Sequence, residues 1–493
     1  MLFNSYEFLI FFPIVCLVYF VIPRRFQHIG LLMSSYFFYM CWNAKYAVLL
    51  LFVTVVTFSC GIIIGELASK EMNKKIVVAL GVGICLSVLF LFKYVNLFGS
   101  TLNFVLRRVG IGIIVPSIDF VLPVGISFYT FQALSYVIDV YRGDVKVEKN
   151  FLRFALFVSF FPQLVAGPIE RSKNLLHQVN EEHDFDYENM RRGLLLMVWG
   201  MFLKLVIADR AAMYVNAVYG DITSYGGEYV LMAAILFSIQ IYCDFAGYSI
   251  IAIGAAKVMG FTLMENFNRP YLASTVEEFW RNWHISLTSW FRDYLYIPLG
   301  GNRKGKLRKY INIMIVFLVS GLWHGAGWHF VLWGGINGVY QVIGDVLKST
   351  KIRIRHALKI SDTNKVLLCC RMIITCILVG FAWIFFRADS MGVAIIGIKS
   401  ITQSIVHGIN SEMLHDVFTT VVSGRQFIVL SCAVLILLIA DVLKYNKKNV
   451  YDWLTSRNIV IRWSIYILAV MSIVIFGIWG PEFSAGSFIY FQF

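Results

Sequence analysis

The stretch Tyr46–Gly65 reads YAVLLLFVTVVTFSCGIIIG and carries no charged residue. About 20 apolar residues are enough for a helix to cross the hydrocarbon core of a bilayer. Further runs of this kind occupy residues 6–23, 75–92, 229–242, 366–386, 426–440 and 459–479. Weaker candidates lie near 31–42, 120–138, 152–167, 191–208, 311–323 and 328–345. The sequence therefore predicts an all-α, polytopic membrane protein with about 10–13 membrane segments, some of them re-entrant or interfacial.

The charged residues predict how the chain is oriented in the bilayer. Only 15% of the residues are charged, against about 25% in soluble proteins. The net charge is +14, and because the basic residues lie in short loops, they favour helix orientation and anionic lipid over nucleic acid. No Lys or Arg precedes the first apolar run, and Arg24 and Arg25 follow it directly, so we expect no signal peptide. The positive-inside rule then predicts an N-terminus on the outer side.

The sequence holds no pattern for a metal or a bound cofactor. The nine cysteines lie in apolar runs without a CxxC motif, so we expect small core residues and no disulfide or metal ligand. His324 and His329 are five residues apart and lack the glutamate of HExxH, so no zinc site is predicted. Neither a glycine-rich phosphate loop nor a GxSxG serine occurs.

The segment 268–309 combines a basic tail with regularly spaced aromatic residues. It holds eight Lys or Arg against three acids, and its aromatic residues recur at three- and four-residue steps. This pattern predicts an amphipathic helix with an aromatic face that lies in the interface or dips into it, on the cytoplasmic side.

His324 lies in the stretch SGLWHGAGWHF, residues 320–330, inside an otherwise apolar region. It follows Lys309 by 15 residues, about 22 Å along a helix, which places the imidazole deep in the hydrocarbon. Ionisable residues at that depth are functional candidates, although a core histidine bonded to the backbone is the simpler alternative. Gly321, Gly325 and Gly327 remove side chains around the ring and leave room for a substrate.

Other polar and aromatic residues accompany this histidine. His284, in FWRNWHISL, is a second catalytic candidate if its segment folds back toward His324. Asn282, Trp283 and Trp323 flank the two histidines and are candidate substrate-binding residues. Asp244 is a further candidate for substrate binding, but the commoner role of such a residue is a buried carboxylate paired with Arg or Tyr between helices. A neutral imidazole can take a proton from a hydroxyl that attacks an acyl carbon, so these residues favour acyl transfer.

Six motifs in order resemble the membrane-bound O-acyltransferases, in particular the bacterial branch that contains alginate O-acetylase. His324 matches the histidine that this family treats as catalytic, and His284 matches its second polar position. The resemblance implies one polytopic domain over 1–493, with N-terminal helices in 1–120, a core about 121–345 and C-terminal helices about 366–493. It implies a ring of tilted helices with cytoplasmic and outer funnels that meet near His324. The motifs are LPVGISFYTFQALSYVIDVYRG (122–143), FPQLVAGPIER (161–171), IYCDFAGYSIIAIGAAKVMGF (241–261), FWRNWHISLTSWFRDYLYIPLGGNRKG (279–305), SGLWHGAGWHFVLWGGINGVY (320–340) and the terminal FIYFQF.

The resemblance also implies a reaction and partners. An acetyl group would pass from a cytoplasmic thioester, acetyl-CoA as donor substrate, across a bacterial cell membrane toward a hydroxyl on an exported polysaccharide. An extracytoplasmic acetyltransferase of the SGNH-hydrolase type would be a separate partner, since no such domain is visible in the sequence. Two alternatives stay open: D-alanyl transfer to teichoic acid from a carrier protein, and a transporter or flippase in which His324 relays protons.

Overall fold

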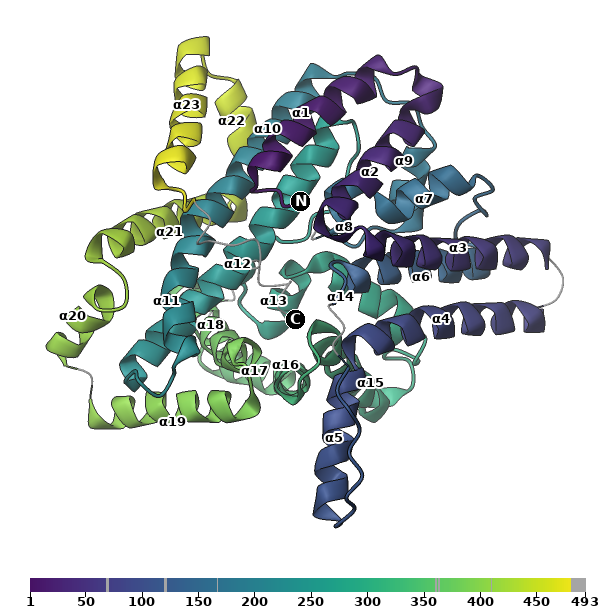
Figure 1. The fold of residues 1–493 in the computed structure, drawn as a ribbon. Helices are drawn as coiled ribbons and strands as arrows, with labels where there is room; N and C mark the ends of the chain where they lie inside the picture. Colours follow the sequence, from purple (N-terminus) through teal and green to yellow (C-terminus); the bar gives the residue numbers. More distant parts are fainter. Residues whose placement is uncertain are drawn as a thin grey trace. The chain divides into compact units, whose positions relative to one another are not determined.

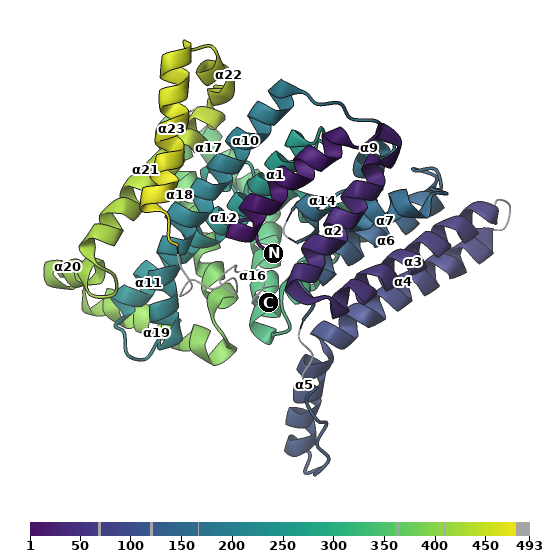
Figure 2. The same cartoon turned by 45° about the horizontal axis from the view of Figure 1, so that its top comes forward.

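The computed structural model describes residues 1–67, 71–118, 122–165, 167–359, 361, 364–408 and 410–479, and every regular element in them is helical (Figures 1 and 2). The terminal FIYFQF motif lies outside these residues. The described chain divides into two compact units, residues 1–197 with 248–264, and residues 198–247 with 265–493. The all-α prediction is confirmed, while the division into N-terminal, core and C-terminal parts stays a prediction.

The first unit contains the N-terminal helices. They are α1 (Tyr6–Val21), η1 (Arg24–Phe26), α2 (Gln27–Asn43), α3 (Lys45–Glu66), α4 (Glu71–Lys93), α5 (Val95–Arg108), α6 (Ile126–Arg142), α7 (Phe151–Ser159), α8 (Phe161–Leu164), η2 (Ser172–Leu176), α9 (His177–Val179) and most of α10 (Tyr187–Met201).

The second unit contains the candidate site. Its elements are η3 (Phe202–Ala208), α11 (Asp209–Gly220), much of α12 (Gly227–Val258), η4 (Pro270–Leu272), α13 (Val276–Asn282), α14 (Ile285–Phe291), η5 (Arg292–Tyr296), α15 (Gly305–His324), α16 (Trp328–Val346), α17 (Lys348–Ala357), α18 (Lys365–Arg387), α19 (Met391–His407), α20 (Ser411–Thr419), α21 (Gly424–Tyr445), α22 (Val450–Thr455) and α23 (Ile459–Phe476).

Six helices among the described residues are long and apolar enough to span a membrane: α3, α4, α12, α18, α21 and α23. The pair α16 and α17, bent by 47°, makes a seventh if it counts as one span. This confirms a polytopic membrane protein, with fewer full-length spans than the 10–13 segments expected. The difference arises because other apolar runs form short or interrupted helices: α1 has only 16 residues, and the run near 191–208 changes from α-helix to the π-helical segment η3.

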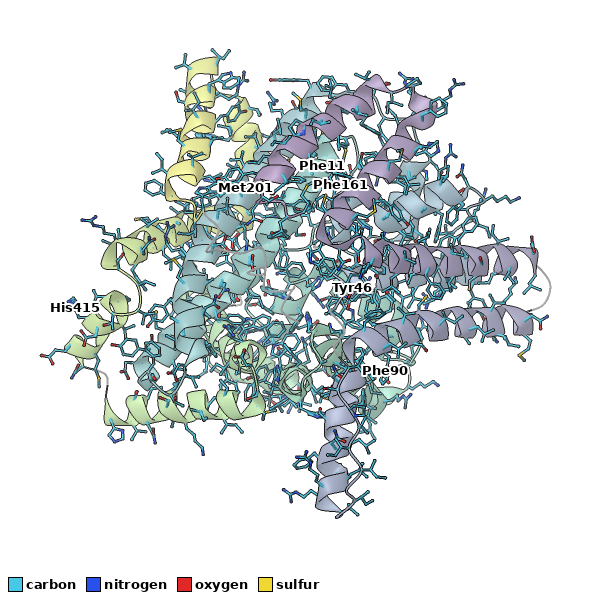
Figure 3. The ribbon with its side chains drawn as sticks, viewed as in Figure 1. Phe11, Tyr46, Phe90, Phe161, Met201 and His415 are labelled. Atoms are coloured by element: carbon cyan, nitrogen blue, oxygen red, sulfur yellow. The ribbon has the colours of Figure 1, made fainter. Side chains whose placement is uncertain are left out.

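The core of the first unit depends on close helix contacts and aromatic packing. A Cβ atom at Gly61 of α3 would overlap the Tyr136 ring of α6, so glycine is what allows this approach, as its small-residue spacing predicts. Phe11 of α1 and Phe161 of α8 meet edge-on, with ring centroids 5.4 Å apart (Figure 3).

Glu170 fastens the loop after α8 to the chain that follows α12. Its Oε1 accepts the Met264 N–H at 2.6 Å, and its Oε2 accepts from the Asn174 amide at 2.6 Å. Burial of the carboxyl group raises the pKa of Glu170 from 4.5 to about 7, against the opposing effect of these hydrogen bonds. This carboxyl group therefore holds its proton in the folded protein at a pH where the unfolded chain has released it.

This raised pKa predicts a pH-dependent loss of stability. Between pH 4.5 and 7 the folded state binds more protons at Glu170 than the unfolded state, so stability falls as pH rises through this window. The slope is at most about 1.4 kcal/mol per pH unit. Glu170→Gln keeps the acceptor oxygen and cannot ionise, so its unfolding midpoint in detergent should gain on wild type from pH 5 to pH 8. A constant difference between the two proteins over that range would contradict the prediction.

In the second unit, α15 and α16 form a helical hairpin that carries His324 at its turn. At the open end, Lys309 Nζ lies 2.7 Å from Asp345 Oδ1, and the Tyr310 hydroxyl donates to Asp345 Oδ2 at 3.1 Å. Along the hairpin, a Cβ atom at Gly321 would overlap the Phe330 carbonyl oxygen, and one at Gly334 would overlap the Phe317 carbonyl. The predicted small-residue packing is thus confirmed here, because the two backbones approach as closely as glycine permits.

Candidate active site

His324 is the last residue of α15, and its ring is enclosed by aromatic side chains. The side chain is only 4% exposed. Its ring centroid lies 4.9 Å from that of Trp323, 5.0 Å from Trp333 of α16 and 5.4 Å from Phe386 of α18. All three neighbours meet the imidazole at steep angles, an arrangement that fixes the ring in the apolar core of the unit.

His284 lies beside His324, as the sequence analysis required for a shared site. The ring centroids are 6.3 Å apart, and His284 is 1% exposed. Phe245 of α12 meets the His284 ring edge-on at 4.6 Å. The two imidazoles come from elements 40 positions apart in the sequence and share one buried aromatic enclosure.

A break in the helix turns His284 toward this enclosure. The residue has φ 44° and ψ 53°, a left-handed conformation that a side chain with a Cβ adopts at a cost of about 1–2 kcal/mol. It separates α13 from α14. The prediction of one continuous amphipathic helix over 268–309 is therefore wrong, and so is the expectation of an interfacial aromatic face, because Phe279, Trp280 and Trp290 are all buried.

Asn266 holds this break in place and was not identified from the sequence. Its backbone carbonyl accepts the Ile285 N–H at 2.9 Å. Its side-chain Oδ1 accepts from the Ser286 N–H at 3.3 Å and from the Ser286 hydroxyl at 2.9 Å, and lies 3.1 Å from His284 Nδ1. Because a backbone N–H can only donate, this atom must be the amide oxygen, and His284 Nδ1 must carry a proton to bond to it. The lone pair of the ring is then on Nε2.

We expect Asn266→Ala to lower kcat by about tenfold, the rate equivalent of one hydrogen bond worth about 1.4 kcal/mol, with little change in KM. Asn266→Asp restores an oxygen acceptor at the same place and should recover turnover. Because a carboxylate favours the imidazolium form, this variant should also shift the pH profile. Equal losses in both variants, with an unmoved pH profile, would reduce Asn266 to a purely structural residue.

The three candidate substrate-binding residues near the histidines differ in their surroundings. Trp323 is buried and packs against both His324 and His284, at 4.9 and 6.0 Å. Trp283 is fully buried and packs on Phe267 and Trp383, at 5.0 and 5.1 Å, so it belongs to the aromatic core. Asn282 ends α13, and its backbone carbonyl accepts the Asn268 N–H at 2.9 Å.

Asp244 is part of a buried ion cluster. Its Oδ1 lies 2.6 Å from Lys204 Nζ, which also lies 2.8 Å from Asp209 Oδ1. The side chains of Lys204 and Asp244 are each 1% exposed. The simpler prediction, a paired carboxylate between helices, describes this arrangement, but the partner is a lysine from the π-helical segment η3 and not the expected Arg or Tyr.

The glycines around His324 have a different role from the one predicted. A Cβ atom at Gly325 would overlap the Phe330 ring, and one at Gly327 would overlap the His329 ring. Together with the contact at Gly321, these positions are filled by α16, so the expectation that they leave room for a substrate is wrong. His329 lies in the first turn of α16, half-buried against Phe330 at 4.2 Å.

Comparisons with known proteins agree with this geometry. The family model described as MBOAT, membrane-bound O-acyltransferase family, matches residues 144–381, which contain all six candidate residues. The chain is 38% identical over 396 residues to the protein named Probable alginate O-acetylase AlgI of Azotobacter vinelandii, covering 80% of this chain and 76% of that protein. It is 30% identical to the peptidoglycan O-acetyltransferase of Helicobacter pylori, over 100% of this chain and 98% of that protein.

A third relative covers a shorter region. The teichoic acid D-alanyltransferase of Streptococcus thermophilus is 30% identical over 45% of this chain and 56% of that protein. The long matches to the two acetylating proteins span both units of the structure, and all matched proteins are named as acyl-transferring enzymes. The chain belongs to the membrane-bound O-acyltransferase family and is an O-acyltransferase.

Proposed function

We propose that the chain transfers an acetyl group from cytoplasmic acetyl-CoA toward a hydroxyl of a cell-envelope polysaccharide, with His324 as the catalytic base. The observation that carries this proposal is the pair of imidazoles 6.3 Å apart, from α15 and from the α13–α14 break, inside one aromatic enclosure. A proton-transfer group in so apolar a place is useful when a hydroxyl must attack an acyl carbon away from bulk water.

The proposed step balances as follows. His324 takes the proton of the acceptor hydroxyl while its oxygen bonds to the thioester carbonyl carbon. The carbon–sulfur bond then breaks, and the imidazolium returns the proton to the departing thiolate, which leaves as coenzyme A. His284, with Nδ1 engaged by Asn266, presents Nε2 as an acceptor and orients the hydroxyl or shares its proton.

The direction of transfer and the partner are part of the same proposal. The predicted cytoplasmic face is basic, which suits the phosphates of acetyl-CoA. The acceptor approaches from the outer face, where a separate hydrolase-type acetyltransferase would pass the acetyl group to the polymer. The cytoplasmic and outer funnels follow from the family resemblance and are proposed on that basis, as is the outer position of the N-terminus in a bacterial cell membrane.

D-alanyl transfer remains the second candidate, supported by the partial match to the D-alanyltransferase. Family membership removes the transporter alternative. Purified protein in nanodiscs should consume [14C]acetyl-CoA in the presence of polysaccharide fragments and the partner protein, releasing free coenzyme A. Labelling only from a D-alanyl carrier protein, with acetyl-CoA untouched, would overturn the acetyl proposal in favour of the alternative.

A further inference from the structure

A small basic cavity lies within the first unit, away from the histidines. Its volume is about 50 Å³, and its walls come from η1, the first turn of α2, the start of α7 and the chain at 179–183. A single water needs about 10–15 Å³ of such space, so the cavity has room for a group with about four oxygens. Arg25, His28 and Arg153 contribute to its lining.

The acidic residues of this region are already engaged by other cations. Arg24 lies 2.6 Å from Asp184 and 3.5 Å from Glu182, and His177 lies 3.1 Å from Glu181. Within the described ranges, neither Arg25 nor Arg153 has a carboxylate at ion-pair distance. The Arg25 guanidinium instead lies 4.7 Å over the Phe26 ring.

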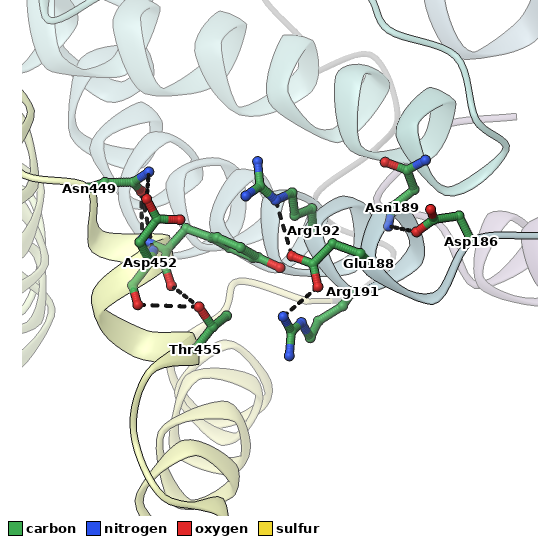
Figure 4. Close-up of polar contacts among 9 residues, drawn as sticks. Asp186, Glu188, Asn189, Arg191, Arg192, Asn449, Asp452 and Thr455 are labelled. Carbon is green, nitrogen blue, oxygen red and sulfur yellow. Dashed lines mark hydrogen bonds and ion pairs between the residues drawn. The ribbon is translucent and has the colours of Figure 1, made fainter.

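Arg153 is the stronger sign of a ligand. Its Nε is buried and has no hydrogen-bond partner in the part of the chain that the structure describes. A buried guanidinium N–H without an acceptor costs free energy, which a bound anion would recover. By contrast, Arg191 and Arg192 of α10, also in the first unit, both pair with Glu188 (Figure 4).

The start of α2 adds a second attractive group for an anion. The helix begins at Gln27, and its N-cap residue Phe26 provides no side-chain hydrogen bond to the first turn. Backbone N–H groups at a helix start carry partial positive charge and bind phosphate readily. The Gln27 amide fixes this turn by donating to the carbonyls of Tyr19 and His183, at 3.3 and 3.2 Å.

We propose that this cavity binds a phosphate ester, with Arg25 and Arg153 as its charged ligands and the first turn of α2 as its amide ligand. Guanidinium groups match phosphate oxygens in charge and geometry. Because Arg24 and Arg25 follow the first apolar run, the site faces the predicted cytoplasmic side. Two sources of the phosphate are then available there: the headgroup of an anionic phospholipid and the phosphates of coenzyme A. The proposal does not depend on the acetyl-transfer proposal.

Binding to full-length protein in a neutral detergent tests this site. The lipid probe is dihexanoyl phosphatidylglycerol, with dihexanoyl glycerol as the phosphate-free control; the second probe is coenzyme A, with pantetheine as its control. Arg25→Gln/Arg153→Gln should weaken binding of one phosphate probe by about tenfold or more. Arg191→Gln/Arg192→Gln, which removes the same charge where the arginines already have a partner, should bind as wild type does.

Each outcome has one meaning. Loss confined to the lipid probe identifies a headgroup site, and loss confined to coenzyme A identifies a site for the donor's phosphate. Unchanged binding of both probes in the Arg25/Arg153 variant overturns the proposal, as does an equal loss in the Arg191/Arg192 control. If the double variant does not fold, Arg25→Gln alone, at an exposed position, provides the same comparison.

Discussion

Replacement of His324 by alanine is expected to abolish acetyl transfer while the protein still inserts and folds. General-base catalysis contributes about 10²–10⁴-fold to a rate, so the variant should lose at least about 100-fold in coenzyme A release. The ring packs between Trp323, Trp333 and Phe386, and its removal leaves a cavity as well as a missing base. His324→Gln therefore belongs in the same experiment, because it fills most of the space and cannot act as a base at neutral pH.

His329 provides the matched control for this prediction. It lies five positions later on α16, half-buried against Phe330, and has no role in the proposed step. His329→Ala should keep transfer within about twofold of wild type, since its loss touches packing at one helix end. Wild-type transfer in a well-folded His324→Gln protein would end the claim that His324 is the base.

The sequence predicted the helices well because their signal is local. Runs such as Tyr46–Gly65 can only be satisfied by a helix in lipid, and α3 occupies Lys45–Glu66. The two histidines were also found from the sequence, since an imidazole inside an apolar region needs a reason. The glycine pattern was ambiguous: small residues allow either a ligand or another helix to approach, and only the structure shows that α16 fills the space.

Other features of the site depend on contacts between distant residues. Asn266 acts on His284 from 18 positions away, through a left-handed residue that no periodicity predicts. The partner of Asp244 is Lys204, 40 positions earlier, on a π-helical turn. An apolar, aromatic-rich spacing such as that of 279–291 is compatible with both an interfacial helix and a buried one. Helix breaks and burial decide between them, and both are set by tertiary packing.

The second large effect is expected at Lys204, where stability and not chemistry should respond. Its ammonium group is the shared partner of Asp209 and Asp244, and all three side chains are at most 7% exposed. Close packing surrounds the cluster, since a Cβ atom at Gly247 of α12 would lie 2.8 Å from the Gly200 carbonyl oxygen. Lys204→Met leaves two carboxylates together in a place with little water, a change that costs about 3–5 kcal/mol.

The size of this loss should depend on which partner is removed. Asp244→Asn keeps Lys204 paired with Asp209, so its unfolding midpoint in detergent should fall far less than that of Lys204→Met. Asp209→Asn/Asp244→Asn added to Lys204→Met removes both uncompensated charges and should recover most of the lost stability. The same variants test the substrate-binding role predicted for Asp244. If that carboxylate only joins helices, Asp244→Asn leaves KM unchanged per folded molecule, whereas a raised KM at unchanged stability would return Asp244 to the list of substrate-binding residues.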